Sequence, residues 1–473
     1  MQGPRVRSGG APEDYPLGRL FDEAFTEEGA ARPGYGPVVS ALESVDLDVL
    51  MRHVDAELAR RGVSFGTTPF HLDPVPRIIP GVAWEPLAAG LAQRVRALEA
   101  FVADVYGARQ IVEAGRVPAR VIDAADHFEP ELAGGAPPSG GWIVLAGLDL
   151  VRTGDGDLVV LEDNVRTPSG FAYAAAARQT LDRFLPVTLP EREPVEHTAF
   201  ALLEGALLAA APPGAPDDPV IVVLSDGPAN SAFYEHAEAA RRLGIALVTL
   251  DDLEHRGDRL HTRVEDRTVP VDVVYRRTDE DRLHDEAGAP TAVAQALLEP
   301  WRSGRIGLVN GFGTGVADDK LVHAYVEEMV RFYLDEEPLV RSVRTLDLGD
   351  DGVRAEALER LDELVVKPRS GFGGEGVVVG PHARRQDLRA LRDQVRDDPE
   401  AFVAQETIHF STHPTVSDGT LRPRHVDLRP YAYRSGDDVA VLPGGLTRVA
   451  LDEGALVVNS SQDGGGKDTW VLR

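Results

Sequence analysis

GLDLVRTGDGDLVVLEDNVRTPSG, residues 147–170, is the stretch that decides the fold expected of this chain. Its pattern predicts a β-hairpin. The first strand is expected over residues 142–151, a Gly/Asp turn over 153–157, and a second strand over 158–161 that runs into Glu162-Asp-Asn164. Gly and Asp are the residues that tight hairpin turns require, so the two strands are expected to lie side by side.

The hairpin is expected to carry oxygen ligands on one wall. Residues two apart on a strand share a face, so Glu162 and Asn164 point the same way while Asp163 points away. Asp149 lies on the neighbouring strand. Two carboxylates and an amide oxygen suit a hard divalent cation such as Mg²⁺. The plain alternative is an acidic strand end that faces water.

Composition narrows the class of protein. The chain has 473 residues, enough for two or three domains, and a formal net charge of −28 that argues against nucleic-acid or anionic-membrane partners. It has no cysteine, which excludes disulfides, thiolate metal sites and a cysteine nucleophile. No apolar run is long enough to span a membrane, and the first residues lack the apolar core of a signal peptide. We therefore expect a cytoplasmic enzyme.

The region before the hairpin is predicted to be mainly helical, with helices over 45–61 and 84–106 joined by a Pro-rich link at 69–80. After a linker at 212–219, residues 220–283 alternate buried strands and helices as an α/β unit does. Its strand over 271–275 delivers Arg276 and Arg277 to a strand end, where adjacent arginines can clamp a carboxylate or phosphate. The alternative is an exposed basic turn paired with the acidic residues 279–281.

Two lysines lie near glycine-rich segments. Asp318-Asp-Lys320 is predicted to open a helix that runs to about Tyr333, and a cation in the first turn of a helix indicates a nearby anion. Lys367 ends a strand and precedes RSGFGGEG, in which Gly371, Gly373 and Gly376 satisfy G-x-G-x-x-G. A dinucleotide fingerprint needs a helix next, whereas a strand follows here. A glycine flap that closes over phosphates fits this order better.

The last part of the chain is predicted to form an antiparallel β region. A strand over 401–405 ends in Gln405-Glu406, whose polar edge can hydrogen-bond an adenine. Ser411 and His413 invite comparison with a hydrolase, but no G-x-S-x-G motif supports a catalytic triad. Lys467, beside three glycines, is either a further phosphate ligand or part of a mobile tail.

Taken together, these motifs resemble the circularly permuted ATP-grasp family, which is distantly similar to glutathionylspermidine synthase. In ordinary ATP-grasp chains the metal ligands follow the lysines, whereas here they come first. The resemblance extends from about Leu17 to the end of the chain. It rests on LEDNVRTPSG, VYRRTDEDRL, NGFGTGVADDK, VVKPRSGFGGEGVVVG, FVAQETIHFSTHPT, HVDLRPYAY, PGGLTRVA and VVNSSQDGGGKDTWVL.

The resemblance implies the site residues. Mg²⁺ would be held by Asp149, Glu162 and Asn164. ATP would be bound by Lys320, Lys367, the flap residues Gly371, Gly373, Gly374 and Gly376, and an adenine edge at Gln405 and Glu406. The transferred phosphoryl group and the substrate carboxylate would be contacted by Arg448, Arg276 and Arg166.

The resemblance also implies an α/β (α+β) fold. It would comprise a helical N-terminal region (1–135), a metal-ligand hairpin segment (136–215), a Rossmann-like α/β domain (216–310), and a part with the lysines, the flap and the C-terminal β region (311–473). The implied activity is ATP-dependent ligation of a small-molecule or peptide carboxylate to an amine through an acyl phosphate. The alternatives are a phosphotransferase on the same fold and a non-catalytic ATP-binding regulatory module.

Overall fold

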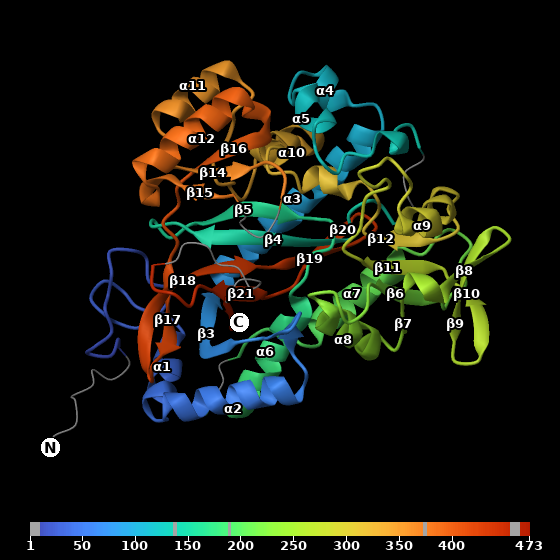
Figure 1. Ribbon diagram of the computed structural model, residues 1–473. Helices are drawn as coiled ribbons and strands as arrows, with labels where there is room; N and C mark the ends of the chain where they lie inside the picture. The colour runs from blue at the N-terminus through green and yellow to red at the C-terminus, as the bar shows by residue number, and fades with distance from the viewer. Residues whose placement is uncertain (1–9, 136–139, 188–190, 372–375, 455–463) are drawn as a thin grey trace.

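The predicted hairpin lies within a large, mostly antiparallel sheet (Figure 1). The computed structural model describes residues 10–135, 140–187, 191–371, 376–454 and 464–473. In these residues the sheet order is β20-β19-β4-β18-β21-β22-β3, with β5 paired to β4 and β17 to β18. The strands are β3 (Leu72–Pro80), β4 (Leu145–Arg152), β5 (Leu158–Asn164), β17 (Thr412–Ser417), β18 (Thr420–Arg429), β19 (Tyr431–Ser435), β20 (Asp438–Val441), β21 (Leu446–Val449) and β22 (Gly465–Leu472).

Helices cover both faces of this sheet. Successive strand residues point to opposite faces, and accordingly Ile78 and Trp470 pack with α2 and α6 while Ile79 and Val471 pack with α3. The long helix α3 thus lies on one face and the α2–α6 pair on the other. The helices before the α/β unit are α1 (Tyr35–Glu43), α2 (Leu47–Arg60), α3 (Gly81–Tyr106), α4 (Gln110–Glu113), α5 (Ala119–Asp123) and α6 (Phe171–Phe184).

The α/β unit lies beside the large sheet and confirms the Rossmann-like expectation. Its parallel strands follow the order β12-β11-β6-β7, and a small antiparallel sheet, β10-β9-β8, is inserted after β7. The strands are β6 (Ile221–Ser225), β7 (Ala246–Val248), β8 (Leu253–Arg256), β9 (Arg259–Val264), β10 (Arg267–Pro270), β11 (Val273–Arg277) and β12 (Gly307–Val309), and the helices are α7 (Thr198–Ala209), α8 (Phe233–Leu243) and α9 (Ala292–Arg302).

A third sheet stands over the β4–β5 hairpin in Figure 1. It has the order β13-β16-β14-β15 and its own hydrophobic core, which includes Leu364, Val366 and Leu391. The two strands predicted on either side of the glycine segment are therefore confirmed as β14 and β15. The elements are α10 (Val326–Leu334), β13 (Thr345–Asp347), α11 (Asp351–Glu359), β14 (Leu364–Pro368), β15 (Val378–Val379), α12 (Arg385–Asp397) and β16 (Phe402–Glu406).

Two local predictions differ from the structure. The Pro-rich link is not a loop but contains β2 (Thr68–Pro69), which pairs with β1 (Ser64–Phe65), and the edge strand β3. Prolines are tolerated in β3 because it has a neighbour, β22, on one side only. The helix expected from Asp318 begins eight residues later, as α10, after the short 3-10 turns at Thr314–Ala317 and Val322–Tyr325.

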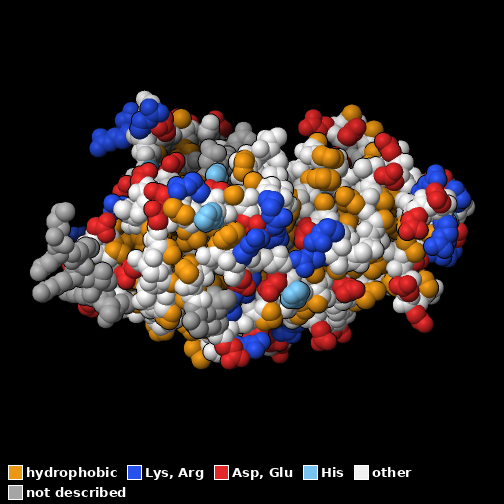
Figure 2. Space-filling view, turned by 90° about the horizontal axis from the view of Figure 1, so that it is seen from below, with side chains coloured by type: hydrophobic (Ala, Val, Ile, Leu, Met, Phe, Trp, Pro, Cys, Tyr) orange, Lys and Arg blue, Asp and Glu red, His pale blue; other side chains and the backbone are white. Residues whose placement is uncertain are grey.

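The surface is mixed in charge. On the face in Figure 2, lysines and arginines occur in several separate groups among acidic side chains, although the net charge is −28. None of the helices in the described residues has the length and apolarity needed to span a membrane.

Candidate active site

The register of the hairpin places the expected ligands together. Asp149 of β4 is opposite Glu162 of β5, and Asn164 is opposite Gly147. The strand continues to Asn164, three residues further than the sequence predicts. As expected, Asp163 points to the other face, where it accepts hydrogen bonds from Arg94 at 2.6 and 2.7 Å. The hairpin therefore presents Asp149, Glu162 and Asn164 on one side.

Asp149 is held by two arginines from neighbouring strands. Arg429 of β18 pairs with it bidentately, at 2.5 and 2.7 Å, and Arg448 of β21 lies 2.9 Å from Asp149 Oδ2. Burial disfavours the charged carboxylate, but the two guanidinium groups outweigh burial and lower the pKa of Asp149. Arg448 also pairs with the buried Asp427 at 2.5 Å. Asp149 is consequently ionised at neutral pH.

The hairpin residues fit a hard divalent cation. Glu162 makes no side-chain hydrogen bond to the described residues, and the buried Asn164 Nδ2 has no hydrogen-bond partner among them. The described residues contain no group of three or more His, Cys, Asp or Glu that could hold a metal. An Asp-Glu-Asn set has only two such residues, with the amide oxygen as the third donor. The chemistry of the donors thus suits Mg²⁺, with Asp149 engaged by arginines here.

Both predicted lysines lie near this wall. Lys320 Nζ donates to the carbonyl oxygens of Arg369 (3.2 Å) and Gly371 (2.6 Å), at the base of the glycine flap. Lys367 of β14 is partly buried, and its desolvation lowers the pKa of its ammonium; Glu162 and Asp149 act in the opposite direction, and Lys320 adds to the lowering. These mutual effects mean that the two lysines and the two carboxylates share one electrostatic site.

The flap has the backbone that its glycines allow. Gly371 and Gly376 have φ values of +91° and +70°, a region that disfavours side chains. A Cβ at Gly376 would also lie 2.7 Å from Pro368 Cγ. Gly373 and Gly374 lie outside the described residues. Both described ends of the flap thus have backbone conformations that favour glycine, and Gly376 packs closely against Pro368, next to Lys367.

The two side chains of the proposed adenine edge have different surroundings. Gln405 donates to Thr345 at 2.9 Å, while its buried Oε1 has no partner among the described residues. The carboxylate of Glu406 is paired with Arg360 at 3.0 Å and with Arg344 at 3.1 Å. Of these two side chains, only that of Gln405 has an unpartnered polar atom.

Arg166 and Arg276 lie in different surroundings. Arg166 donates to Asp318 at 3.0 Å and lies 2.9 Å from His127 Nε2. Burial raises the pKa of the Asp318 carboxyl to about 6, although Arg166 opposes this. Arg276 is only 1% exposed, stacks on Phe312 and has two nitrogens without partners among the described residues. It is not exposed to the cavity described next.

A cavity of about 210 Å³ opens beside the hairpin. Its polar side contains Asn164, Arg166, Asp318, Arg429 and Arg448, and its apolar side contains Phe65, Phe70, Tyr173 and Leu446. Residues 167–170 complete the lining. The metal-ligand candidate Asn164 is therefore shared between the hairpin and this cavity.

The loop at 168–170 is held in position by Glu235 and Arg277. At the start of α6, the buried Glu235 carboxylate accepts hydrogen bonds from the backbone N–H groups of Gly170 (2.8 Å) and Ala172 (2.9 Å). Arg277 donates to Pro168 O at 3.0 Å. The helix N-terminus thus binds a carboxylate of this chain.

Lys467 is also internal. It is fully buried in β22 and pairs with Asp73 of β3, and it donates to Pro414 O at 3.1 Å. Neither the phosphate role nor the mobile tail describes Lys467, because a buried ion pair fixes it between two strands.

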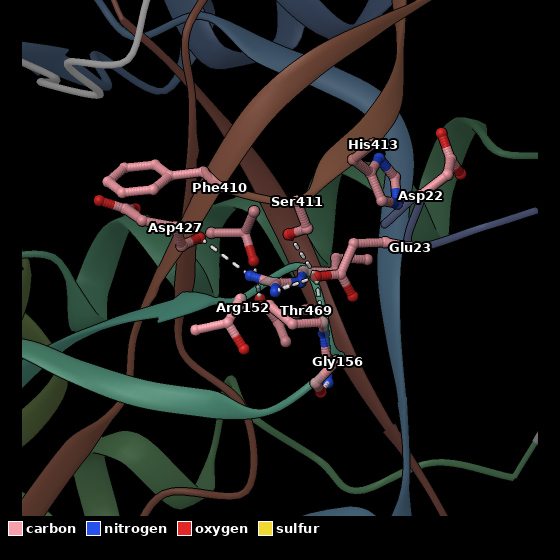
Figure 3. A network of polar contacts seen from close by, with 12 residues as sticks. Asp22, Glu23, Arg152, Gly156, Phe410, Ser411, His413, Asp427 and Thr469 are labelled. Carbon is pink, nitrogen blue, oxygen red and sulfur yellow. Dashed lines mark hydrogen bonds and ion pairs between the residues drawn. The ribbon is translucent and has the colours of Figure 1, made fainter. Parts of the chain in front are cut away.

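The surroundings of Ser411 and His413, shown in Figure 3, do not support a hydrolase triad. Ser411 donates to Glu23 at 2.7 Å, and Glu23 is also paired with Arg77 and Arg152 at 2.5 and 2.9 Å. His413 instead contacts Tyr35 at 3.1 Å. Ser411 therefore serves a buried ion-pair network, and no serine–histidine pair forms there.

Sequence reasoning missed several residues of the cavity. Arg429, to which the sequence analysis assigns no role, lies on β18 two residues after Asp427 and reaches Asp149. Phe65 and Tyr173 are over a hundred residues apart in the chain, so no local pattern connects them. From the sequence, Asp318 is expected only to open a helix.

Comparisons with known proteins agree with this geometry. The sequence profile described as circularly permuted ATP-grasp type 2 matches residues 76–450, which include the hairpin, both lysines and Arg448. An uncharacterized protein of Mycobacterium tuberculosis is 43% identical over 465 residues, covering 96% of this chain and 84% of that protein. The Frankia alni protein named "Putative glutamate--cysteine ligase 2-3" is 44% identical over 472 residues, covering 96% of this chain and 54% of that protein.

Among solved structures, a glutathione synthetase-like effector from Globodera pallida in its apo form matches with a TM-score of 0.58. The match covers 90% of this chain and 98% of that chain, at 13% identity. At this level of identity the likeness shows a common fold.

Proposed function

Because this chain belongs to the circularly permuted ATP-grasp type 2 family, we propose that it is an Mg-ATP-dependent ligase that joins a carboxylate to an amine. The observation that carries the proposal is that Lys320 binds the base of the flap that follows Lys367, while Glu162 and Asp149 of the hairpin are near enough to Lys367 to oppose the lowering of its pKa. Cations and oxygen ligands facing each other are what a metal–triphosphate needs. The name of the Frankia alni relative, of which the chain covers 54%, also supports a ligase.

Each part of the site has a role in this proposal. Lys320 and Lys367 bind the nucleotide phosphates, and the flap that begins at Gly371 closes over them. Gln405 accepts a hydrogen bond from the adenine through its unpartnered Oε1. Asp149, Glu162 and Asn164 would hold Mg²⁺, which supplies neutralisation of the phosphate charge when bound.

The proposed chemistry has two steps. A carboxylate oxygen of the substrate attacks the γ-phosphorus, the bond to the β-phosphate oxygen breaks, and ADP leaves. The amine nitrogen then attacks the acyl carbon, the carbon–oxygen bond to phosphate breaks, and the amine loses a proton. Arg429 and Arg448 lie where they can orient the acid and stabilise the charge on the transferred phosphoryl group. Exclusion of water by the flap protects the acyl phosphate from hydrolysis.

The scarcity of lysine in this chain allows a direct test of the nucleotide site. The sequence contains only three lysines, Lys320, Lys367 and Lys467. An acyl-phosphate derivative of ATP acylates lysines that lie beside its phosphates. We expect peptide mapping to find label on Lys320 or Lys367 that excess Mg-ATP removes, while the buried Lys467 serves as an internal control.

Calorimetry with a non-hydrolysable ATP analogue extends the test. Lys367→Met is expected to weaken binding by tenfold to about a hundredfold, the typical effect of losing a charge-assisted hydrogen bond. Glu162→Gln is expected to reduce the dependence of binding on magnesium. Absence of nucleotide binding by the folded wild-type protein would refute the proposal.

Turnover separates ligation from its alternatives. A ligase releases ADP only when an acid and an amine are both supplied, apart from slow hydrolysis of the acyl phosphate. Rapid ADP release with one substrate alone would indicate a phosphotransferase. Nucleotide binding without turnover across a broad screen of acids and amines would indicate a regulatory module.

A further inference from the structure

The cavity beside the hairpin has a cationic side. Arg166, Arg429 and Arg448 line it, and among the described lining residues Asp318 is the one carboxylate. Asp149 and Asp427, which pair with two of these arginines, are each only 2% exposed and lie behind the wall. Arginine presents planar N–H groups that match a carboxylate. An anionic group is therefore favoured at this side.

Another part of the cavity lining, here called its aromatic side, consists of Phe65, Phe70, Tyr173 and Leu446. The Tyr173 ring lies 5.3 Å from the Phe70 ring and 6.0 Å from the Phe65 ring, measured between centroids, and Leu446 continues the surface. Such a wall favours an apolar or aromatic group, because burial of apolar area and ring-to-ring contact both stabilise binding.

This wall is held in position by distant segments. Strands β1 and β2 have two residues each, too short to be stable alone. They are anchored by Tyr173, whose hydroxyl donates to Ser64 O at 2.9 Å, and by Gly66, whose N–H donates to Ser231 O at 2.6 Å. A Cβ on Gly466 would lie 2.4 Å from the Phe70 ring, so β22 also fits closely against it. The aromatic side is thus a preformed surface.

The size of the cavity limits its occupant. A volume of about 210 Å³ is smaller than the roughly 300 Å³ at which pockets for drug-sized ligands begin. The occupant is therefore a small acid, or the terminal residue of a longer molecule.

We propose that this cavity is the site of the carboxylate substrate and that it selects acids bearing an apolar or aromatic group about the size of one amino-acid side chain. The carboxylate faces Arg429 and Arg448, and the apolar group lies on Phe65 and Tyr173. The assignment as a substrate site rests on the proposed ligase function, whereas the preference for such acids rests on the cavity alone.

The test uses simple probe molecules and the full-length chain. Binding of phenylacetate, acetate and phenethylamine is measured by NMR titration in the presence of magnesium and a non-hydrolysable ATP analogue. We expect phenylacetate to bind at least tenfold more tightly than acetate, because only phenylacetate buries an aromatic ring. Phenethylamine, which has the same ring and the opposite charge, should not compete.

Variants of Phe65 test whether the aromatic side of the cavity causes the preference for phenylacetate. Phe65→Ala, at a partly exposed position, is expected to weaken phenylacetate binding by about tenfold without changing acetate binding. Phe65→Leu should retain part of the preference. The matched control is Phe184→Ala, a partly exposed phenylalanine at the other end of α6, which stacks on His53 and should change neither acid.

The outcomes separate this proposal from the ligase function. Equal affinity for acetate and phenylacetate, or an unchanged ratio in Phe65→Ala, overturns the acid preference even where nucleotide binding succeeds. Selective phenylacetate binding by a protein that binds no nucleotide upholds the preference and refutes the ligase.

Discussion

At the residue scale, the roles of the charged side chains follow from partners that are far away in the sequence. Asp149 is ionised because Arg429 and Arg448 surround it, whereas the partly buried Lys367 has no hydrogen bond to the described residues. Burial without a partner costs free energy, and such groups are retained where function needs them. Asp149 is therefore stabilised by its partners within the chain, whereas Lys367 is available to bind a ligand.

Lys367→Met should separate stability from binding. Removing a partly buried cation that has no partner among the described residues is expected to leave the free energy of unfolding unchanged or to raise it by about 1 kcal/mol, while nucleotide binding weakens by tenfold to about a hundredfold. Urea unfolding provides the measurement. Lys320→Met is the comparison. It removes two hydrogen bonds to carbonyl oxygens and should lower the free energy of unfolding by about 1 kcal/mol. Destabilisation of Lys367→Met by more than about 2 kcal/mol would contradict the interpretation.

Glu23→Gln should reveal a pH-dependent contribution to stability. Burial disfavours the Glu23 carboxylate, but Arg77 and Arg152 outweigh burial and lower its pKa below the ordinary 4.5. A lowered carboxyl pKa stabilises the fold above the unfolded-state pKa and loses this effect as pH falls. We expect Glu23→Gln to lose about 3 kcal/mol of unfolding free energy at pH 7, and this loss to become smaller as the pH falls below 4.5.

Urea unfolding of wild type and Glu23→Gln over this pH range checks the prediction. Glu254→Gln, an exposed carboxylate paired with Arg256, is the control and should change stability by less than about 1 kcal/mol at any pH. A pH-independent difference for Glu23→Gln would show that the lowered pKa of Glu23 is not its source.

At the element scale, the site is formed by loops that rigid elements hold. The segment 168–170 follows β5 and leads into α6, and the Glu235 carboxylate of α8 binds the backbone at this junction. Burial raises the pKa of Glu235, and Arg277 opposes the rise. The α/β unit therefore positions a loop that lines the cavity in the neighbouring sheet region.

Glu235→Gln tests this connection. Both N–H groups donate to the same oxygen, Oε2, so the amide oxygen of Gln can still accept them, but the amide carries no charge and its NH2 group is placed against Arg277. The two hydrogen bonds are therefore weakened, and a loss of about 2 kcal/mol of unfolding free energy is expected. Hydrogen exchange of these two amides should accelerate, and phenylacetate binding should weaken. Glu238→Gln on the same helix, whose partners are Arg241 and Arg242, should leave that exchange unchanged. Unaltered exchange in Glu235→Gln would exclude the positioning role.

At the scale of the whole molecule, distant parts of the chain complete one sheet. Strand β3, within the first eighty residues, pairs in parallel with β22, within the last ten. The buried pair of Lys467 and Asp73 joins the two strands. Because Phe70 and Gly466 meet at this seam, the aromatic side of the cavity depends on it as well.

A double-mutant cycle on Lys467→Met and Asp73→Asn measures this seam. Each single change leaves a buried charge unpaired and should lose about 3–5 kcal/mol of unfolding free energy. The double variant should lose less than the sum, with a coupling of about 1–3 kcal/mol. Strictly additive losses would show that the ion pair does not couple the strands.

What the sequence by itself determined is local. The Gly/Asp turn and the alternation around Glu162 and Asn164 predicted the hairpin and its oxygen wall, because strand periodicity decides which face a side chain takes. The residues around the glycine segment likewise predicted the strands β14 and β15 on either side of it, and the α/β unit followed from its alternating helices and strands.

What only the tertiary structure decided is which distant residues meet. The arginines on Asp149, the carboxylate of Glu235 at the start of α6, the burial of Arg276 and the pairing of Lys467 all depend on strand order and long-range register. The aromatic wall joins Phe65 to Tyr173 across more than a hundred residues. Local sequence patterns carry no information about such contacts, since burial and charge pairing arise only when the sheets and helices pack together.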